Sequence, residues 1–209
     1  MTIWDNIYKK YKTGGEAYAT LSREIHPLFR TFLKRSKFKN KFALDIGCGT
    51  GGYMKALRTI GFNAEGIDSS KTAIKIAQEN LKDKLHLICK DMFKFKIPKN
   101  RYGLIISVST IHHGTKKQVE DLIDLIYDAL IRGGKAFITL PDVHCIKSWN
   151  SFKKHKKIAK YTIVPLSGPE KGLPHSFYTK NEIKKLFSKF KDLRLRLDSE
   201  GAWVVIASR

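Results

Sequence analysis

The sequence predicts a single α/β domain with a doubly wound, mostly parallel sheet and an antiparallel hairpin at its C-terminal end. Three observations predict this fold. The apolar segment 42–46 runs directly into the glycine-rich turn 47–52, which is how a buried strand meets the N-terminus of a helix. Strand-like and helix-like segments alternate from there to residue 140, as in parallel sheets covered by helices on both faces. Two further strand-like segments, 193–197 and 202–207, are joined by a short polar turn.

Each element of the parallel part has a local signal. The first helix follows the turn over residues 53–60, where apolar residues recur at helical spacing. Ser70 is placed to cap a second helix, whose inward-facing residues are Ile74, Ala77 and Leu81. The strands are expected at five apolar segments, which are residues 42–46, 63–67, 85–89, 103–108 and 135–140.

Capping boxes begin the two later helices. Thr115 with Gln118 begins one, and its inward-facing residues are Val119, Ile123, Ile126 and Leu130. Gly133 and Gly134 are expected to end that helix, because glycine adopts the left-handed conformation common after a helix C-terminus. Thr179 with Glu182 begins the last helix, which places on one face Ile183, Leu186, Phe187 and Phe190.

Two segments fall outside this alternation, residues 1–41 and residues 141–178. Loops at the carboxyl ends of parallel strands carry ligand specificity, so we expect both segments to act as lids. The single domain then divides into a helical lid (1–41), a cofactor-binding core (42–140), a lid or substrate insertion (141–178) and a final helix with the hairpin (179–209). Packing onto the sheet rim is the alternative role of the lid aromatics. The candidate substrate-binding residues are Trp4, Tyr8, Tyr11, Trp149 and Tyr178.

The glycine-rich turn predicts a nucleotide-binding corner, since its backbone can approach a ligand closely. Gly47, Gly49 and Gly52 also fit the dinucleotide pattern, which is weak on its own. Asp45 favours S-adenosylmethionine over a dinucleotide as the ligand. A carboxylate two residues before the first glycine would repel a pyrophosphate, whereas S-adenosylmethionine presents an ammonium and a sulfonium there.

Two more carboxylates end the next two strands. Asp68 lies twenty-one residues after Gly47 and can accept hydrogen bonds from both ribose hydroxyls. Asp91 follows the third strand, where it can accept a hydrogen bond from an adenine amine. Three carboxylates therefore lie at the ends of three successive strands.

On these motifs, together with Leu130-Ile131-Arg132-Gly133-Gly134, the chain resembles the class I S-adenosylmethionine-dependent methyltransferases, which have a Rossmann-like fold. The resemblance covers roughly residues 40–140. It implies that Gly47, Gly49 and Gly51 approach the methionine moiety, that Asp68 holds the ribose, and that Asp91 with Met92 frames the adenine. A purely structural glycine turn and a dehydrogenase are the alternatives. The candidate cofactor-binding residues are Asp45, Gly47, Cys48, Gly49, Gly51, Asp68, Ser69, Asp91, Met92 and Ser107.

Three histidines are candidate catalytic residues. Methyl transfer from a sulfonium needs a nucleophile in line with the methyl group in a site shielded from water, and an acceptor that must lose a proton also needs a base. His112 and His113 follow the fourth strand, and His175 lies in a loop rich in proline and glycine. A structural role for these histidines is the alternative. We expect His112 to act before the other two, because it lies nearest the strand end.

The segment after the fourth strand, Ser107-Val108-Ser109-Thr110, lacks the signatures of several nucleic-acid methyltransferases. It has neither the Asp/Asn-Pro-Pro-aromatic motif of enzymes that methylate base amines, nor the cysteine of carbon-5 cytosine methylation, nor the aspartate of ribose methylation. The run Ile111-His112-His113 resembles wobble-uridine methyltransferases that esterify a carboxylate. Over the whole chain the resemblance is to small methyltransferases called type 11/12 or tellurite-resistance-like.

The chain is strongly basic, with a formal net charge of +21. Residues 1–41 carry 10 basic and 3 acidic side chains, and residues 141–191 carry 12 and 3, so most of the excess falls on the expected lids and the helix that follows the second one. A basic rim would draw anions toward the cleft, whereas a solvated basic surface is the alternative. The three cysteines form no C-x-x-C pair, which together with the absence of a signal core favours the cytoplasm.

The sequence therefore predicts methyl transfer from S-adenosylmethionine to a small, anionic or soft nucleophilic acceptor. A tRNA methyltransferase of the wobble-uridine type, using the basic lid, is one alternative. A non-catalytic cofactor-binding partner subunit is another. The sequence indicates no metal, no membrane and no stable partner protein, and the acceptor atom stays open.

Overall fold

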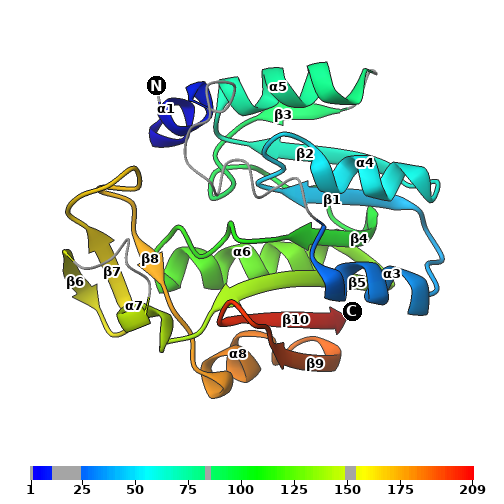
Figure 1. Ribbon diagram of the computed structural model, residues 1–209. Coiled ribbons are helices and arrows are strands. Elements are labelled where there is room, and N and C mark those ends of the chain that lie inside the picture. The colour runs from blue at the N-terminus through cyan, green and yellow to red at the C-terminus, as the bar shows by residue number, and fades with distance from the viewer. Residues whose placement is uncertain (1, 11–24, 83–85, 149–153) are drawn as a thin grey trace.

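The computed structural model describes residues 2–10, 25–82, 86–148 and 154–209. Its centre is a seven-stranded sheet in the order β3-β2-β1-β4-β5-β10-β9 (Figure 1). The strands β1 to β5 run parallel, and β10 is antiparallel to both β5 and β9. This arrangement confirms the predicted sheet and hairpin. The strands are β1 (Phe42–Ile46), β2 (Asn63–Asp68), β3 (Leu87–Cys89), β4 (Tyr102–Ser107), β5 (Leu130–Pro141), β9 (Lys191–Leu197) and β10 (Ala202–Ser208).

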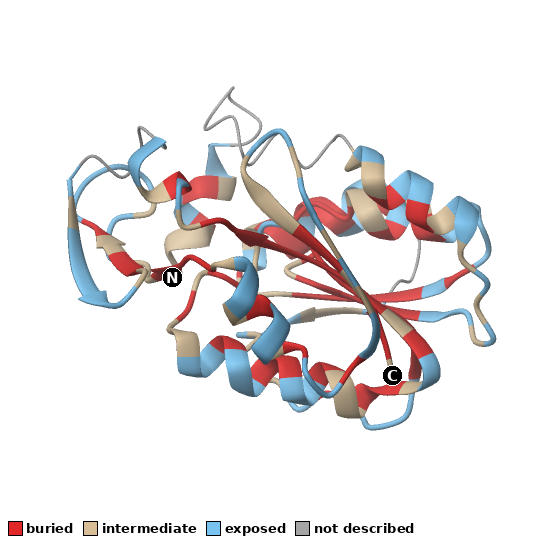
Figure 2. Cartoon of the chain, turned by 90° about the horizontal axis from the view of Figure 1, so that it is seen from below, coloured by how far each residue is buried: buried red, intermediate tan, exposed pale blue. Residues whose placement is uncertain are grey.

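Helices cover the sheet on both faces, so that the central strands β1, β2 and β4 are buried between them (Figure 2). One core cluster joins the sheet to α3 (Pro27–Arg35), α4 (Gly52–Thr59) and α5 (Lys71–Leu81). The other joins it to α6 (Lys116–Ala129) and α8 (Lys180–Leu186). Continuously buried strands are the expected result of covering a parallel sheet on both faces.

The predicted helix starts are confirmed by hydrogen bonds. The Ser70 hydroxyl accepts from the Ala73 amide at the start of α5. Thr115 and Thr179 form capping boxes at the starts of α6 and α8. Such caps satisfy backbone N–H groups that have no partner inside the helix.

The prediction that two glycines end α6 is wrong. The helix ends at Ala129, because Leu130 already has extended backbone angles, φ −69° and ψ 143°, and begins β5. The register then shifts, since Tyr102 pairs with Leu130 but Leu104 pairs with Lys135. Gly133, with φ +79°, lies in the irregular stretch between these two pairs, where a positive φ is best accommodated by glycine.

Residues 141–178 contain a second, three-stranded sheet that the sequence pattern did not predict. It comprises β6 (His155–Ala159), β7 (Thr162–Pro165) and β8 (His175–Ser176), preceded by the short helix α7 (Cys145–Ser148). Strand β6 is lysine-rich and exposed, so it lacks the alternation that indicates a strand. Ser176 attaches this sheet to the core: its amide donates to the His112 carbonyl at 2.9 Å and its hydroxyl to the Gly114 carbonyl at 2.7 Å.

The N-terminal helix α1 (Ile3–Lys9) is fixed to the start of α5. Asp5 forms a capping box with Thr2 and also accepts from the Ser70 hydroxyl at 2.9 Å and the Thr72 amide at 3.2 Å. Burial raises the pKa of Asp5, but these hydrogen bonds outweigh burial and lower the pKa to about 2. Within the described residues, we find no helix long and apolar enough to span a membrane.

Candidate active site

The glycine turn after β1 holds three residues with positive φ. Gly47 has φ +76°, Gly49 +51° and Gly51 +84°, in the region that favours glycine. A Cβ on Gly47 would lie 2.1 Å from the Thr110 methyl carbon, so a side chain there would displace the loop after β4. Gly51 instead caps α4 and packs against Leu81.

Asp68 ties the carboxyl end of β2 to this turn. Its Oδ2 accepts from the Gly49 amide at 3.0 Å, and its Oδ1 accepts from the Ser70 amide at 2.8 Å. Burial raises the pKa of this carboxyl, and the hydrogen bonds from the Ser70 and Gly49 amides lower it in part. A carboxylate has about four lone-pair sites, so Asp68 can still accept further hydrogen bonds.

Asp45 is buried on β1, with 3% of its surface exposed. Its Oδ2 has no hydrogen-bond partner among the described residues. Burial and the neighbouring charge of Asp68 raise the pKa of Asp45 to about 8. A buried carboxyl with so high a pKa can bind a cation, because a nearby positive charge stabilises its carboxylate form.

A cavity of about 1480 Å³ opens beside the turn, more than the roughly 300–1,000 Å³ of a single small-molecule site. It therefore has room for a cofactor and an acceptor together. The predicted cofactor residues that line it are Asp45, Gly47, Cys48, Gly49, Asp68, Ser69, Asp91 and Met92.

Other predicted residues lie elsewhere. Ser107 is fully buried and donates to the Ile46 carbonyl at 2.9 Å, so it supports the strand rather than the cavity. Trp4 and Tyr8 of α1 line the cavity, whereas Tyr178 is buried against the Lys116 ammonium, 3.9 Å from its ring centre. Two candidates lie outside the described residues, namely Tyr11 and Trp149.

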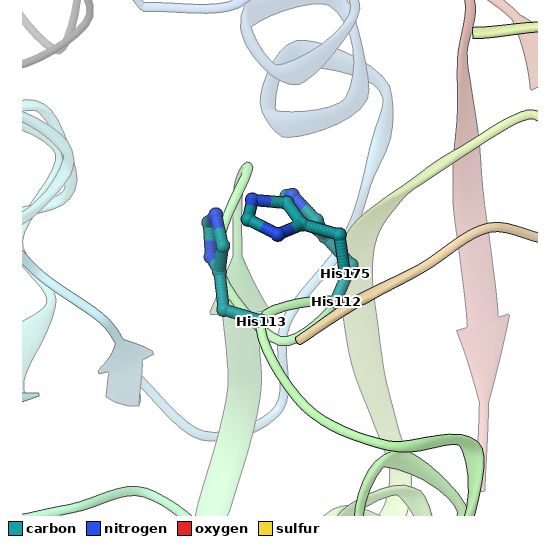
Figure 3. A group of neighbouring side chains, drawn as sticks. All are labelled: His112, His113 and His175. Atoms are coloured by element: carbon teal, nitrogen blue, oxygen red, sulfur yellow. The ribbon is translucent and has the colours of Figure 1, made fainter. Parts of the chain in front are cut away.

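The three predicted histidines line the cavity, where their rings form one group (Figure 3). His112 and His113 lie in the loop after β4, and His175 lies in β8. The ring centres are 4.0 Å apart for His112 and His113, 4.7 Å for His113 and His175, and 5.8 Å for His112 and His175. Trp4 packs edge-on against His113 at 4.8 Å.

Two of these rings are held neutral by their surroundings. Burial, with His113 and His175 nearby, lowers the pKa of His112 far below its usual range. Burial and His175 lower the pKa of His113 to about 4, although Glu170 and the Thr110 carbonyl raise it in part. A neutral imidazole with so low a pKa is a weak base but keeps a lone pair for other partners.

Residues 43–134 match a family model described as a methyltransferase domain. Residues 43–134 therefore form a class I S-adenosylmethionine-dependent methyltransferase domain. The predicted family and cofactor are confirmed, and the seven-stranded sheet is the one expected of that class.

Relatives and solved structures agree with this assignment. The chain is 29% identical over 134 residues to an uncharacterized methyltransferase from Geobacillus, covering 64% of this chain and 63% of that protein. It is 28% identical to the ribosomal RNA small subunit methyltransferase C of Buchnera aphidicola, covering 78% and 51%. For the human probable tRNA methyltransferase 9B, the identity is 27% and the coverage 64% and 28%. The chain thus spans less than two thirds of each of these relatives.

The fold extends over the whole chain. The crystal structure of the PH0226 protein from Pyrococcus horikoshii matches with a TM-score of 0.77 at 16% identity, covering 100% of this chain and 99% of that one. A structure of an S-adenosylmethionine-dependent methyltransferase from Clostridium acetobutylicum matches with a TM-score of 0.67 at 12% identity, covering 98% and 97%. At these identities the likeness concerns the fold.

Sequence reasoning missed one group in the site of the methyltransferase domain. Glu170 lines the cavity, its Oε2 2.8 Å from His175 Nε2 and its Oε1 3.8 Å from His113 Nε2. Burial raises the pKa of this carboxyl, but the contact with the His175 ring and the nearby His113 outweigh burial and lower it. The run Gly168-Pro169-Glu170 marked a turn, but nothing local indicated which side chain the carboxylate faces.

The charge of the cavity differs from that of the surface. Its described lining contains two cationic side chains, Lys90 and Arg196, and six carboxyl groups, which are those of Asp45, Asp68, Asp91, Glu170, Asp198 and Glu200. The lysines of the second sheet point elsewhere and are exposed. The described lysines of β6 are therefore exposed and do not line the cavity.

Proposed function

We propose that this protein transfers a methyl group from S-adenosylmethionine to a small, soft nucleophile, such as a thiol, bound in the cavity. The observation that carries the proposal is the enclosure of the acceptor side by α1 and the insertion. Trp4 and Tyr8 contribute one wall, and Pro169, Leu173 and Pro174 another. A cavity closed by apolar side chains excludes water from the reacting atoms.

The residues at the strand ends fit the cofactor, and their roles are part of the proposal. Asp68 and Asp91 offer carboxylate oxygens to hydroxyl and amine groups, while Asp45 offers a buried, unpaired oxygen to a cation. When bound, the cofactor supplies an electrophilic methyl group on a sulfonium with a neutral leaving group. This chain's own residues then need to orient the acceptor and keep water away.

The acidic lining favours a soft nucleophile over an anion. Even without Asp45, which is mostly protonated near neutral pH, five carboxyl groups face two cationic side chains and would repel an acceptor of high negative charge. A thiol ionises near neutral pH, with an ordinary pKa of about 8.5, and its thiolate is nucleophilic without a strong base.

Incubation with methyl-labelled cofactor and fractionated cell extract tests this proposal. We expect label in low-molecular-mass thiols, with thiol-blocking reagent removing the signal. Label that stays with macromolecules and is lost on ribonuclease treatment would contradict the small-acceptor proposal.

An RNA acceptor is the second candidate, favoured by relatives named as RNA methyltransferases and by the exposed lysines of the insertion. For RNA, the affinity should fall with salt at a log–log slope of about −0.7 per phosphate contacted. A small acceptor should show no such steep dependence.

Neutralising the basic face of the insertion separates the two candidates. We expect a triple alanine variant to leave the acceptor KM and the cofactor affinity nearly unchanged, because these exposed lysines do not line the cavity that binds both molecules. Steady-state kinetics at low salt measure this effect. The substitutions are Lys154→Ala, Lys156→Ala and Lys157→Ala; Lys153 lies outside the described residues.

A charge-matched triple variant on and after α3 is the control, with substitutions at Lys34, Lys37 and Lys39. A rise in KM confined to the insertion variant would favour RNA or an anionic acceptor.

Replacing His113 by alanine begins a test of the three candidate catalytic histidines, of which His112 is the one predicted to act first. A general base typically contributes about 10²- to 10⁴-fold to turnover. For a soft nucleophile, we expect kcat to fall by less than about tenfold and the acceptor KM to rise, because His113 with Trp4 forms part of the acceptor wall. The same assay on His112→Ala and His175→Ala completes the series, and a 10³-fold fall in kcat in any one variant would restore the general-base role.

A further inference from the structure

The histidine cluster has a hydrogen-bond pattern that the proposed methyl transfer does not use. His113 Nδ1 lies 2.8 Å from the Thr110 carbonyl oxygen, and His175 Nδ1 lies 2.9 Å from the Leu173 carbonyl oxygen. A carbonyl oxygen only accepts, so both Nδ1 atoms carry the proton. In this tautomer, the lone pair of each ring is on Nε2.

Both lone pairs face the same carboxylate. Glu170 Oε2 is 2.8 Å from His175 Nε2, and Oε1 is 3.8 Å from His113 Nε2. Two acceptor atoms at 2.8 Å require a proton or a cation between them. In a tetrahedral zinc site with bonds of about 2.1 Å, neighbouring ligand atoms are about 3.4 Å apart. This spacing lies between the 2.8 Å that separates His175 Nε2 from Glu170 Oε2 and the 3.8 Å that separates His113 Nε2 from Glu170 Oε1.

The backbone carbonyls complete the pattern. Histidines that bind a metal nearly always donate their other ring N–H to a carbonyl or a carboxylate, which fixes the ring and its tautomer. His113 and His175 both do so. These rings come from segments far apart in the sequence, the loop after β4 and strand β8.

His112 supplies a further donor. Its side chain is buried, and its Nδ1 has no hydrogen-bond partner among the described residues. Burying a polar atom without a partner costs free energy, which a bound ion would offset. Ligand atoms of His112, His113 and His175 all lie within 4.8 Å of one another, so the three rings are gathered around one point.

We propose that His112, His113, His175 and Glu170 bind one divalent transition-metal ion of the Zn²⁺ type. Imidazole nitrogens with one carboxylate are a donor set typical of zinc, cobalt and iron(II) rather than of magnesium or calcium. Because Glu170 and His175 lie in the insertion, whereas His112 and His113 lie in the core, the ion fastens the insertion over the cavity. The competing arrangement is a proton shared between His175 and Glu170.

Binding of Co²⁺ to untagged protein tests the proposal without cofactor or acceptor, so its outcome is independent of the methyl-transfer proposal. The protein is treated with a chelator, dialysed and titrated with Co²⁺, which reports its coordination through visible absorption bands. We expect one ion per chain with the intense bands of a four- or five-coordinate site, and a rise in the thermal unfolding midpoint. Absence of these bands, with no shift in the midpoint, would overturn the proposal.

Variants locate the site. His113→Ala and Glu170→Gln should each weaken Co²⁺ binding by more than about tenfold, and the exposed His86→Ala is the matched control. Far-ultraviolet circular dichroism and binding of S-adenosylhomocysteine show whether each variant is folded. If folded His113→Ala and Glu170→Gln proteins bind Co²⁺ as tightly as the wild type, the ion lies elsewhere and the assignment is wrong.

Discussion

Replacing Asp68 by alanine is expected to weaken binding of S-adenosylmethionine and S-adenosylhomocysteine by about 1–3 kcal/mol, roughly 5- to 150-fold. Two effects act together. The variant loses the charged acceptor that we propose for the ribose hydroxyls. It also frees the amides of Gly49 and Ser70, which the carboxylate holds at 3.0 Å and 2.8 Å. Isothermal titration measures the affinity directly.

Controls separate ligand binding from folding. Asp121→Ala removes an exposed carboxylate that pairs with Lys117 outside the cavity, and it should bind the cofactor as the wild type does. Asp68→Asn keeps one side-chain acceptor for a loop amide and should lie between the wild type and Asp68→Ala. An unchanged affinity in Asp68→Ala, or preferential binding of NAD, would contradict the proposed cofactor geometry.

The cofactor side of the cavity could be predicted from the sequence because its signals are local. The glycines after β1 and the carboxylates at the ends of β1 and β2 are placed by strands that pair in parallel register. Asp45, for example, lies opposite Gly66 in that register. Once the strands are recognised, their carboxyl ends must meet at one edge of the sheet.

The acceptor side could be predicted only in part, because contacts between distant segments form it. The sequence identified the three histidines, but the approach of Glu170 to His113 depends on how the insertion folds. That fold depends on Ser176, whose amide and hydroxyl bond to carbonyls more than sixty residues away. Ser176 carries no sequence signal for these bonds.

The charge of the cavity could not be predicted from the sequence either. The excess of lysine in residues 141–191 was visible in the sequence, but the sequence did not show whether these lysines face the cavity or the outer surface. The exposed strand β6 carries lysines on the outer surface, while the cavity is lined mostly by carboxyl groups. Net charge by segment therefore indicated a basic surface and not the charge of the site.

Cofactor binding is expected to release a proton from Asp45. In the free protein, burial and Asp68 raise the pKa of this carboxyl to about 8, so at pH 6–7 it is mostly protonated. A bound cation favours the carboxylate and lowers that pKa. Between pH 5.5 and 7, below the pKa of about 8 of the cofactor's own amine, the affinity should rise with pH by up to about tenfold per unit.

Calorimetric titration in buffers of different ionisation enthalpy counts this proton. The wild type should release close to one proton at pH 6.5, and Asp45→Asn should release almost none while binding the cofactor more weakly. An affinity independent of pH in the wild type, with no proton released, would refute the proposed pairing of Asp45 with the cofactor's cation.

The same carboxyl gives a stability effect of defined sign. Its pKa is raised above the unfolded value of about 3.9, so between pH 4 and 8 the folded free protein binds more protons than the unfolded chain. The free energy of unfolding should therefore fall as pH rises through this window. Asp45→Asn cannot ionise and should lose that decline, so at pH 8 its thermal midpoint should exceed that of the free wild type. A lower midpoint in the variant at pH 8 would show that the buried carboxylate stabilises the free protein.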